Sequence, residues 1–278
     1  MTEPIFILGS VRSGTTILAH CLGSHPDVCW AYTPETGYEL SSLWAQWTDL
    51  ELGVPEIGCR CGPSDRPAGP TQRDRLARGL AQFHQQFNGG KGRLLLKHPH
   101  FWNKLGWLRG ALPRARLVIS SRDLRSTVLS TQMLWMRTMR RTGYKHYLPP
   151  EPDACWWVVP PDWREGDPAR VFPGGSVVVL AEYWLRVYQT LDTQLQPSDR
   201  PLFFHHEDLL QRPHECLDRL ADGLGLSPFA QDLIPSIDSR RNQRWQALLT
   251  SAERAQLDDF VAAHGSTIGG LRCCDRRV

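Results

Sequence analysis

A strand that runs into a glycine-bounded loop and then a helix opens this sequence and limits its fold more than any other feature. Residues 4–9, PIFILG, form a short apolar run between Pro4 and Gly9, which is typical of a buried strand. The loop GSVRSGTT follows at 9–16, and residues 14–24 carry apolar side chains at helical spacing up to a terminal glycine. This order is typical of a phosphate-binding loop in a parallel α/β sheet.

The loop lacks the lysine that nucleotide triphosphatases and kinases carry after the second glycine, because Thr15 stands there. Arg12 stands two residues before that glycine, Gly14. The start of a helix offers unpaired amides and a partial positive charge, so residues 12–16 (Arg12, Ser13, Gly14, Thr15 and Thr16) are expected to hold an anion. The loop therefore predicts a ligand with one phosphate and an attached second anionic group, bound without metal. A plain polar turn is the alternative.

The rest of the chain repeats the strand and helix alternation of a parallel sheet. We expect one α/β domain over residues 1–278, a P-loop-like three-layer fold with a central parallel sheet flanked by helices. The further strands are predicted at 93–97, 116–120 and 201–205. The further helices are predicted at 37–50, 71–88, 101–112, 123–140, 177–196, 213–224 and 250–263.

Residues 141–176 break this alternation. The stretch holds seven prolines together with Trp156, Trp157 and Trp163. We interpret it as an irregular insertion that packs over the active edge of the sheet as a cap for the acceptor, since long ordered loops are often lids. An ordinary proline-rich surface loop is the alternative.

The overall charge and composition exclude several classes of protein. The net charge of +3, from 32 basic and 29 acidic residues, lacks the basic excess of a dedicated nucleic-acid binder. No apolar run is long enough for a membrane helix, and the N-terminus does not have the pattern of a signal peptide. The eight cysteines do not match a zinc-site spacing and are expected to be reduced, in a cytoplasmic protein. The excess of arginine over lysine favours a bacterial source.

Five segments together resemble the sulfotransferases that use 3′-phosphoadenosine-5′-phosphosulfate (PAPS). The first is IFILGSVRSGTTILAHCLGSHPDVCWAYTPET at the N-terminus, which is especially similar to tyrosylprotein sulfotransferases and their bacterial relatives. The others are KHP at 97–99, SSRDLRSTVLS at 120–130, HHEDLL at 205–210 and RW at 244–245. In order and spacing they cover most of the chain.

The resemblance implies a second group of cofactor contacts. In the family, an arginine and a serine that match Arg122 and Ser130 hold the 3′-phosphate of PAPS, and a basic residue that matches Arg244 helps to bind the cofactor. The positions are physically compatible with this role, because Arg122 ends a strand and Ser130 lies two helical turns further along, so both can face a groove at the edge where open α/β sheets bind ligands. A surface helix with a capping SRD segment is the alternative that the residues alone leave open. Arg125 is interpreted as a solvated helix charge.

Catalysis of sulfuryl transfer requires a base and positive partners for the sulfonyl and bridging oxygens. Arg12 and the amides of the loop can serve the sulfonyl and phosphate oxygens, and Lys97 matches a family lysine that meets charge on the bridging oxygen. For the base, Glu35 resembles the glutamate of tyrosylprotein sulfotransferases, although it comes two residues later. His100 is the alternative, by its resemblance to the histidine of cytosolic sulfotransferases.

The sequence therefore predicts an enzyme of the EC 2.8.2 class that moves a sulfuryl group from PAPS to a hydroxyl, in-line and without metal. A hydroxyl of a natural product, lipid or sugar is the expected acceptor, with no nucleic-acid partner and no stable membrane insertion. The alternatives are a P-loop small-molecule or nucleotide kinase and a nucleotide-binding module without turnover. A homodimer is left open.

Overall fold

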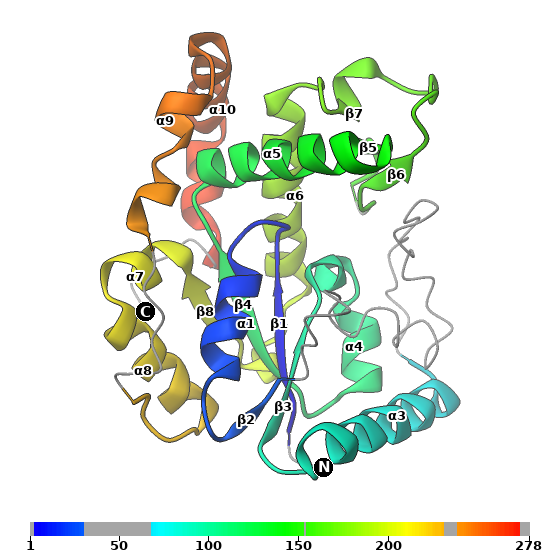
Figure 1. Ribbon diagram of the computed structural model, residues 1–278, viewed down its shortest axis with the longest axis vertical. Helices are drawn as coiled ribbons and strands as arrows, with labels where there is room; N and C mark the ends of the chain where they lie inside the picture. Colours follow the sequence, from blue (N-terminus) through cyan, green and yellow to red (C-terminus); the bar gives the residue numbers. More distant parts are fainter. Residues whose placement is uncertain (1–2, 31–67, 153, 231–237, 273–278) are drawn as a thin grey trace.

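The computed structural model describes residues 3–30, 68–152, 154–230 and 238–272. Its main feature is a five-stranded parallel sheet in the order β2-β3-β1-β4-β8. The strands are β1 (Ile5–Gly9), β2 (Val28–Cys29), β3 (Arg93–Lys97), β4 (Arg116–Ser121) and β8 (Leu202–His205). Figure 1 shows β1 and β4 rising toward α5 (Leu124–Thr142), which crosses above the carboxyl ends of the strands.

Side chains that alternate along β1 divide the core into two layers, because successive residues of a strand point to opposite faces. Ile5 and Ile7 pack on one face against α1 (Thr15–Gly23) and α8 (Pro213–Leu224). Phe6 and Leu8 pack on the other face in a cluster that includes helices α3, α4 and α6. The bounds of these helices are Pro70–Asn88, Leu105–Ala111 and Val177–Gln194. The predicted three-layer α/β fold is confirmed.

The helix predicted at 101–112 is only partly correct. Residues Pro99–Asn103 form a 3-10 helix, η1, and the α-helix begins at Leu105. The interruption follows from Pro99, which starts the 3-10 turn, and from Lys104, whose backbone (φ −132°, ψ 26°) is not helical. The helix predicted at 37–50 lies outside the described residues.

The insertion at 141–176 is not irregular, which corrects that part of the prediction. Its described residues include an antiparallel sheet in the order β6-β5-β7, which lies beside the C-terminal end of α5 in Figure 1. The strands are β5 (Lys145–Tyr147), β6 (Trp157–Val159) and β7 (Val171–Phe172). They are two or three residues long, so they carry too few positions for a period-two pattern to be recognised.

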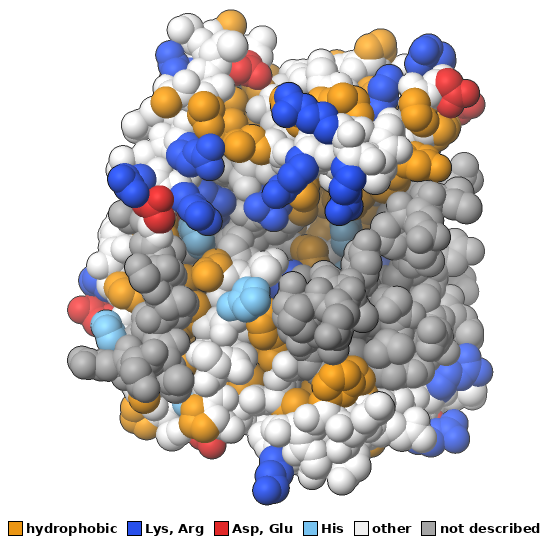
Figure 2. Space-filling view, viewed as in Figure 1, with side chains coloured by type: hydrophobic (Ala, Val, Ile, Leu, Met, Phe, Trp, Pro, Cys, Tyr) orange, Lys and Arg blue, Asp and Glu red, His pale blue; other side chains and the backbone are white. Residues whose placement is uncertain are grey.

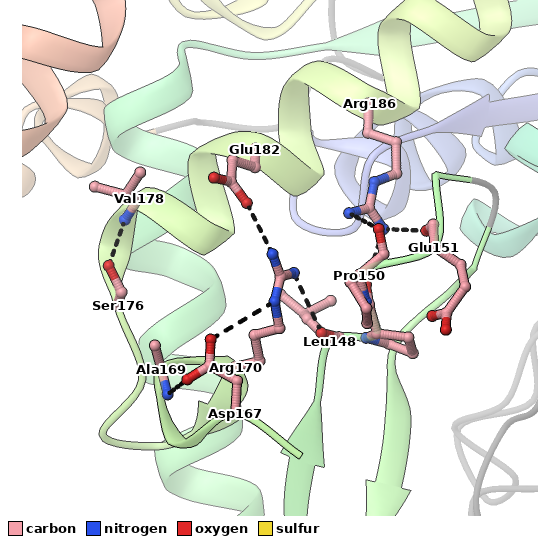
Figure 3. A network of polar contacts seen from close by, with 11 residues as sticks. Leu148, Pro150, Glu151, Asp167, Ala169, Arg170, Ser176, Val178, Glu182 and Arg186 are labelled. Carbon is pink, nitrogen blue, oxygen red and sulfur yellow. Dashed lines mark hydrogen bonds and ion pairs between the residues drawn. The ribbon is translucent and has the colours of Figure 1, made fainter.

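Polar contacts fasten this small sheet to α6 (Figure 3). Arg170 Nη2 donates to Glu182 Oε2 at 3.4 Å, and Arg186 Nη1 donates to the carbonyls of Pro149 and Glu151 at 3.2 and 2.8 Å. The insertion is therefore a structured part of the domain, held on the same helix that packs against the main sheet.

The C-terminal elements complete the fold beside α5. They are α7 (His206–Gln211), η5 (Ser239–Asn242), α9 (Trp245–Leu248) and α10 (Ser251–Gly270), with short 3-10 turns η2 (Pro168–Arg170) and η3 (Pro197–Asp199) earlier in the chain. Arg125 is not a solvated helix charge as expected. Its Nη2 donates to Asp258 Oδ1 at 2.5 Å and its guanidinium lies over the Trp245 ring, so it joins α5 to α9 and α10.

Candidate active site

Two glycines and one strained arginine shape the loop between β1 and α1. Gly9 has φ +148°, and a Cβ there would lie 2.3 Å from the carbonyl oxygen of Ser120 on β4. Gly14 has φ +97°, and a Cβ there would lie 2.8 Å from His206 Nδ1. Arg12 itself has φ 67°, a conformation that non-glycine residues adopt at a cost and that recurs at functional sites. The loop backbone can take this path only with glycine at both ends.

The strained conformation at Arg12 accompanies a contact with α5. Arg12 Nε donates a hydrogen bond to Ser130 Oγ at 3.0 Å, and Arg122 Nη1 donates to the Arg12 carbonyl at 3.4 Å. Burial lowers the pKa of both arginines. Arg137 lowers the pKa of Arg12 further, whereas the charge of Glu207 opposes the lowering at Arg122. The loop after β1 and the β4–α5 region, about 110 residues apart in sequence, thus bring the three predicted cofactor contacts Arg12, Arg122 and Ser130 together.

A residue that the sequence analysis did not single out positions Arg122. Asn242, on η5, accepts from Arg122 Nε at 2.7 Å with its Oδ1 and donates from Nδ2 to Glu207 Oε1 at 3.0 Å. Ser126 Oγ donates to the Asn242 carbonyl at 2.6 Å. Sequence offered no signal for these contacts, because Asn242 is 120 residues from Arg122 and stands in no motif.

Lys97 reaches the same loop from the end of β3. Its Nζ donates to Thr16 Oγ1 at 2.9 Å, and the side chain is buried. Burial and the charge of Arg12 lower the pKa of Lys97 to about 7. An anion beside this ammonium would favour its charged form and raise the pKa again.

These groups face a cavity of about 1300 Å³ at the carboxyl edge of the sheet. Figure 2 shows the hollow below the row of Lys and Arg side chains that overlies α5. Among the described residues, the predicted contacts on its wall are Arg12, Gly14, Thr15, Thr16, Lys97, Arg122, Ser130 and Arg244. His206, from the HHEDLL segment, also lies on the wall, and its pKa is lowered to about 3 by burial and by Arg122.

Three predicted site residues are not part of this wall as the structure describes it. Ser13 is buried under the loop, where Ser120 Oγ donates to its carbonyl at 2.9 Å. His100 packs against the Trp156 ring, with centroids 4.8 Å apart, and its pKa is lowered to about 3 mainly by burial. Glu35, the favoured base, lies outside the described residues.

The described part of the chain contains no group of three or more metal-ligating side chains. Cys21, Cys29, Cys155 and Cys216 are free and buried, while the other four cysteines lie outside the described residues. None of the described helices combines the length and the apolar character that crossing a membrane requires.

The fold and the cavity define the class: a three-layer α/β protein with a glycine-bounded loop and a basic cavity at the carboxyl edge of its sheet. The model of the sulfotransferase family matches residues 4–156, more than half of the chain. The chain therefore belongs to the sulfotransferase family.

Individual relatives are distant. Nodulation protein NoeE of Sinorhizobium fredii (strain NBRC 101917 / NGR234) is 24% identical over 285 residues, which cover 93% of this chain and 63% of NoeE. The chain thus spans less than two thirds of that relative. The crystal structure of sulfotransferase STF9 from Mycobacterium avium is 14% identical, covers 94% of this chain and 76% of its own, and has a TM-score of 0.51. Mouse sulfotransferase SULT7A1 complexed with PAP is 11% identical, with coverages of 94% and 84% and a TM-score of 0.47.

Proposed function

We propose that this protein transfers a sulfuryl group from PAPS to a hydroxyl of a small-molecule acceptor, without a metal ion. One observation carries the proposal: Arg12 of the loop, Lys97 of β3, Arg122 after β4 and Ser130 of α5 face one cavity. Membership of the sulfotransferase family supports the same reaction.

The residues at the loop fit a phosphate that carries a second anionic group. Helix α1 has no side-chain cap and no acidic residue in its first turn, so its first amides remain available to an anion. These amides and Arg12 would hold the 5′-phosphosulfate, and Arg122, Ser130 and Arg244 would hold the 3′-phosphate. The clash at Gly14 leaves no room for a side chain between the loop and His206, so the loop backbone packs directly against His206 on the cavity wall.

Bound PAPS would supply the sulfuryl group and a phosphate leaving group. Lys97 is placed to meet the negative charge that grows on the leaving oxygen, because its ammonium already reaches Thr16 on the loop. Arg12, which donates a hydrogen bond to Ser130, would neutralise the sulfonyl oxygens. The protein's part is thus to bind, orient and balance charge.

The base that removes the acceptor proton is proposed to be Glu35. His100 is the second choice, because an imidazole with a pKa of about 3 accepts a proton poorly at neutral pH. Replacement of Glu35 by Gln should abolish turnover and leave binding of 3′,5′-adenosine bisphosphate (PAP) unchanged. Full turnover in this variant would exclude Glu35 as the base.

Three further parts of the proposal rest on the sequence: the subgroup within the family, the class of acceptor and the insertion as a cap. The likeness of the loop region to tyrosylprotein sulfotransferases and bacterial relatives supports that subgroup, and the tryptophan-rich insertion supports an acceptor with an apolar or aromatic body or a sugar. None of the described residues on the cavity wall comes from 141–176, so the cap is proposed from the sequence alone. A kinase is disfavoured because Asp238 is the only carboxylate of the described wall, and it is bonded to Arg240.

Calorimetric titration of the purified protein with PAP in chelator, beside ATP with Mg²⁺, tests the proposal. We expect tight, metal-free binding of PAP that is lost in Arg122→Ala. A preference for ATP with Mg²⁺ would contradict a sulfotransferase and favour the kinase.

A further inference from the structure

The cavity holds more positive charge than PAPS can neutralise. Eight arginine and lysine side chains lie on its described wall, and Asp238 is the only carboxylate there. Asp238 accepts from Arg240 Nε at 2.9 Å, and the charge of Glu207 acts on Arg122, so six cations remain to be neutralised. PAPS carries roughly four negative charges at neutral pH, counted from its phosphates and sulfate. A site of this composition has unused positive charge when the nucleotide is bound.

The surplus is arranged along one face of α5. The wall residues Ser130, Met133, Arg137 and Arg140 follow one another at intervals of three or four, so they share that face. At 1.5 Å per residue, Arg137 and Arg140 lie about 10 and 15 Å along the helix from Ser130. The cofactor contacts are thus at the N-terminal end of the face, and the two arginines are at its other end.

The helix itself does not account for this arrangement. Basic residues in the last turn of a helix complement its dipole, which explains Arg140 and Arg141 but not Arg137. Arg137 lies close enough to Arg12 to lower the pKa of Arg12, so the two cations repel each other in the empty site. An anion between the two ends of the face would relieve this repulsion.

An apolar surface separates the two charged regions. Met133 and Met136 are each 40% exposed, among the few large apolar side chains of the described chain that are open to solvent, and both lie on the wall. A ligand that spans the face would therefore meet cations, then methionine side chains, then cations again.

On this basis, and resting on the function proposed above, we propose that the acceptor is an amphiphilic anion. Its carboxylate or phosphate binds Arg137 and Arg140, its apolar chain lies on Met133 and Met136, and its hydroxyl, on the order of 10–15 Å from the anionic group, faces Arg12 and Lys97. The two arginines are specificity residues for the acceptor and take no part in binding the nucleotide.

Calorimetry on the PAP-loaded protein in chelator tests this with two matched probes, 12-hydroxydodecanoate and the neutral 1,12-dodecanediol. We expect the carboxylate to bind about tenfold more tightly than the diol, as charged hydrogen bonds predict. The Arg137→Gln/Arg140→Gln double variant should lose this preference and keep its affinity for PAP. The Arg141→Gln variant, changed on the same helix at a residue outside the cavity wall, should keep both.

The two proposals fail in different ways. Absence of PAP binding to the wild type would overturn the sulfotransferase function. Normal PAP binding with equal affinity for the two probes would overturn the anionic acceptor alone. A loss of PAP affinity in the double variant would also overturn it, because the arginines would then belong to the nucleotide site.

Discussion

Arg12 connects backbone strain to ligand binding at the scale of a single residue. Its positive φ costs folding free energy of about 1–3 kcal/mol, and in the structure that conformation accompanies the contact with Ser130. Nothing in the apolar core requires an arginine there. The strain is therefore explained if the side chain contributes to a function that the fold alone does not need.

Replacement of Arg12 by Ala should weaken PAP binding by about thirtyfold or more, since a charge-assisted hydrogen bond to an anion is lost. Calorimetric titration in chelator measures the change. Arg114→Ala is the matched control, because that side chain is 72% exposed and is remote from the cavity wall. An Arg12→Ala protein with wild-type affinity would remove the loop from the proposed cofactor site.

The lowered pKa of Lys97 predicts that the affinity for PAP depends on pH. Its pKa of about 7 lies below the ordinary 10.5, so the empty site loses this charge as the pH rises through 7. A bound anion raises the pKa, and binding then takes up a proton above pH 7. PAP affinity should fall between pH 7 and 9, a range in which the phosphate keeps its charge.

The Lys97→Met variant should bind PAP more weakly at pH 7 and should lose this pH dependence, which calorimetry at four pH values would measure. Lys97→Arg should bind tightly and without the pH dependence, because a guanidinium stays charged. An unchanged slope in Lys97→Met would mean that another group titrates.

At the residue scale, sequence could predict contacts that belong to a local motif. Arg12 and Thr16 were predictable because the strand–loop–helix unit fixes where the loop lies. Asn242 was not, because its contact with Arg122 depends on how the C-terminal elements pack beside α5. Long-range positioning residues leave no periodic signal in one sequence.

Whole helices and strands also differ in how well the sequence alone predicts them. Strands β1, β3, β4 and β8 were predictable as apolar runs bounded by turn residues, since a buried parallel strand needs apolar side chains on both faces. The small sheet β6-β5-β7 was missed, since its strands are short and stand among prolines. Its stability comes from contacts with α5 and α6 rather than from local propensity.

The attachment of the insertion to α6 can be tested separately from the cofactor site. Arg186→Met removes hydrogen bonds to three carbonyls, those of Pro149, Pro150 and Glu151. We expect a loss of about 1–3 kcal/mol in the free energy of unfolding and a melting temperature lower by a few degrees. Calorimetric scanning measures this, and PAP affinity should stay within about twofold because Arg186 is not on the cavity wall.

Arg164→Met is the control for this change. Arg164 lies in the same insertion but donates only to Pro161 and Trp163, its own neighbours, and is exposed. Its loss should leave the melting temperature unchanged. Equal effects of the two substitutions would show that the insertion is not held through α6.

At the scale of the whole molecule, the cavity joins segments from both ends of the chain. The loop after β1, the end of β3, α5 and the segment at Arg240–Arg244 all contribute to its wall. A ligand held by all of them binds only the folded state, so it should stabilise the molecule as a unit. An anionic ligand should stabilise the fold further, because it relieves the repulsion among the cations of the empty wall.

PAP at about 100 times its dissociation constant should therefore add about 2.7 kcal/mol to the free energy of unfolding. For a domain of this size the melting temperature should rise by several degrees, and the rise should be the same in chelator as in Mg²⁺. The rise should shrink as salt is added, because partly exposed arginines are screened. Differential scanning calorimetry measures all three effects.

The Arg122→Ala variant tests whether the rise in melting temperature comes from PAP bound in this cavity or from an anion that stabilises the protein elsewhere. Its melting temperature without PAP should fall by a few degrees at most, because the loss of the hydrogen bond to Asn242 and of the attraction to Glu207 is partly offset by the loss of a buried charge and of the repulsion from Arg12. Its rise with PAP should be absent, since the 3′-phosphate loses its main partner. A variant that PAP still stabilises fully would show that the nucleotide binds elsewhere, and the cavity would then have to be assigned to a different ligand.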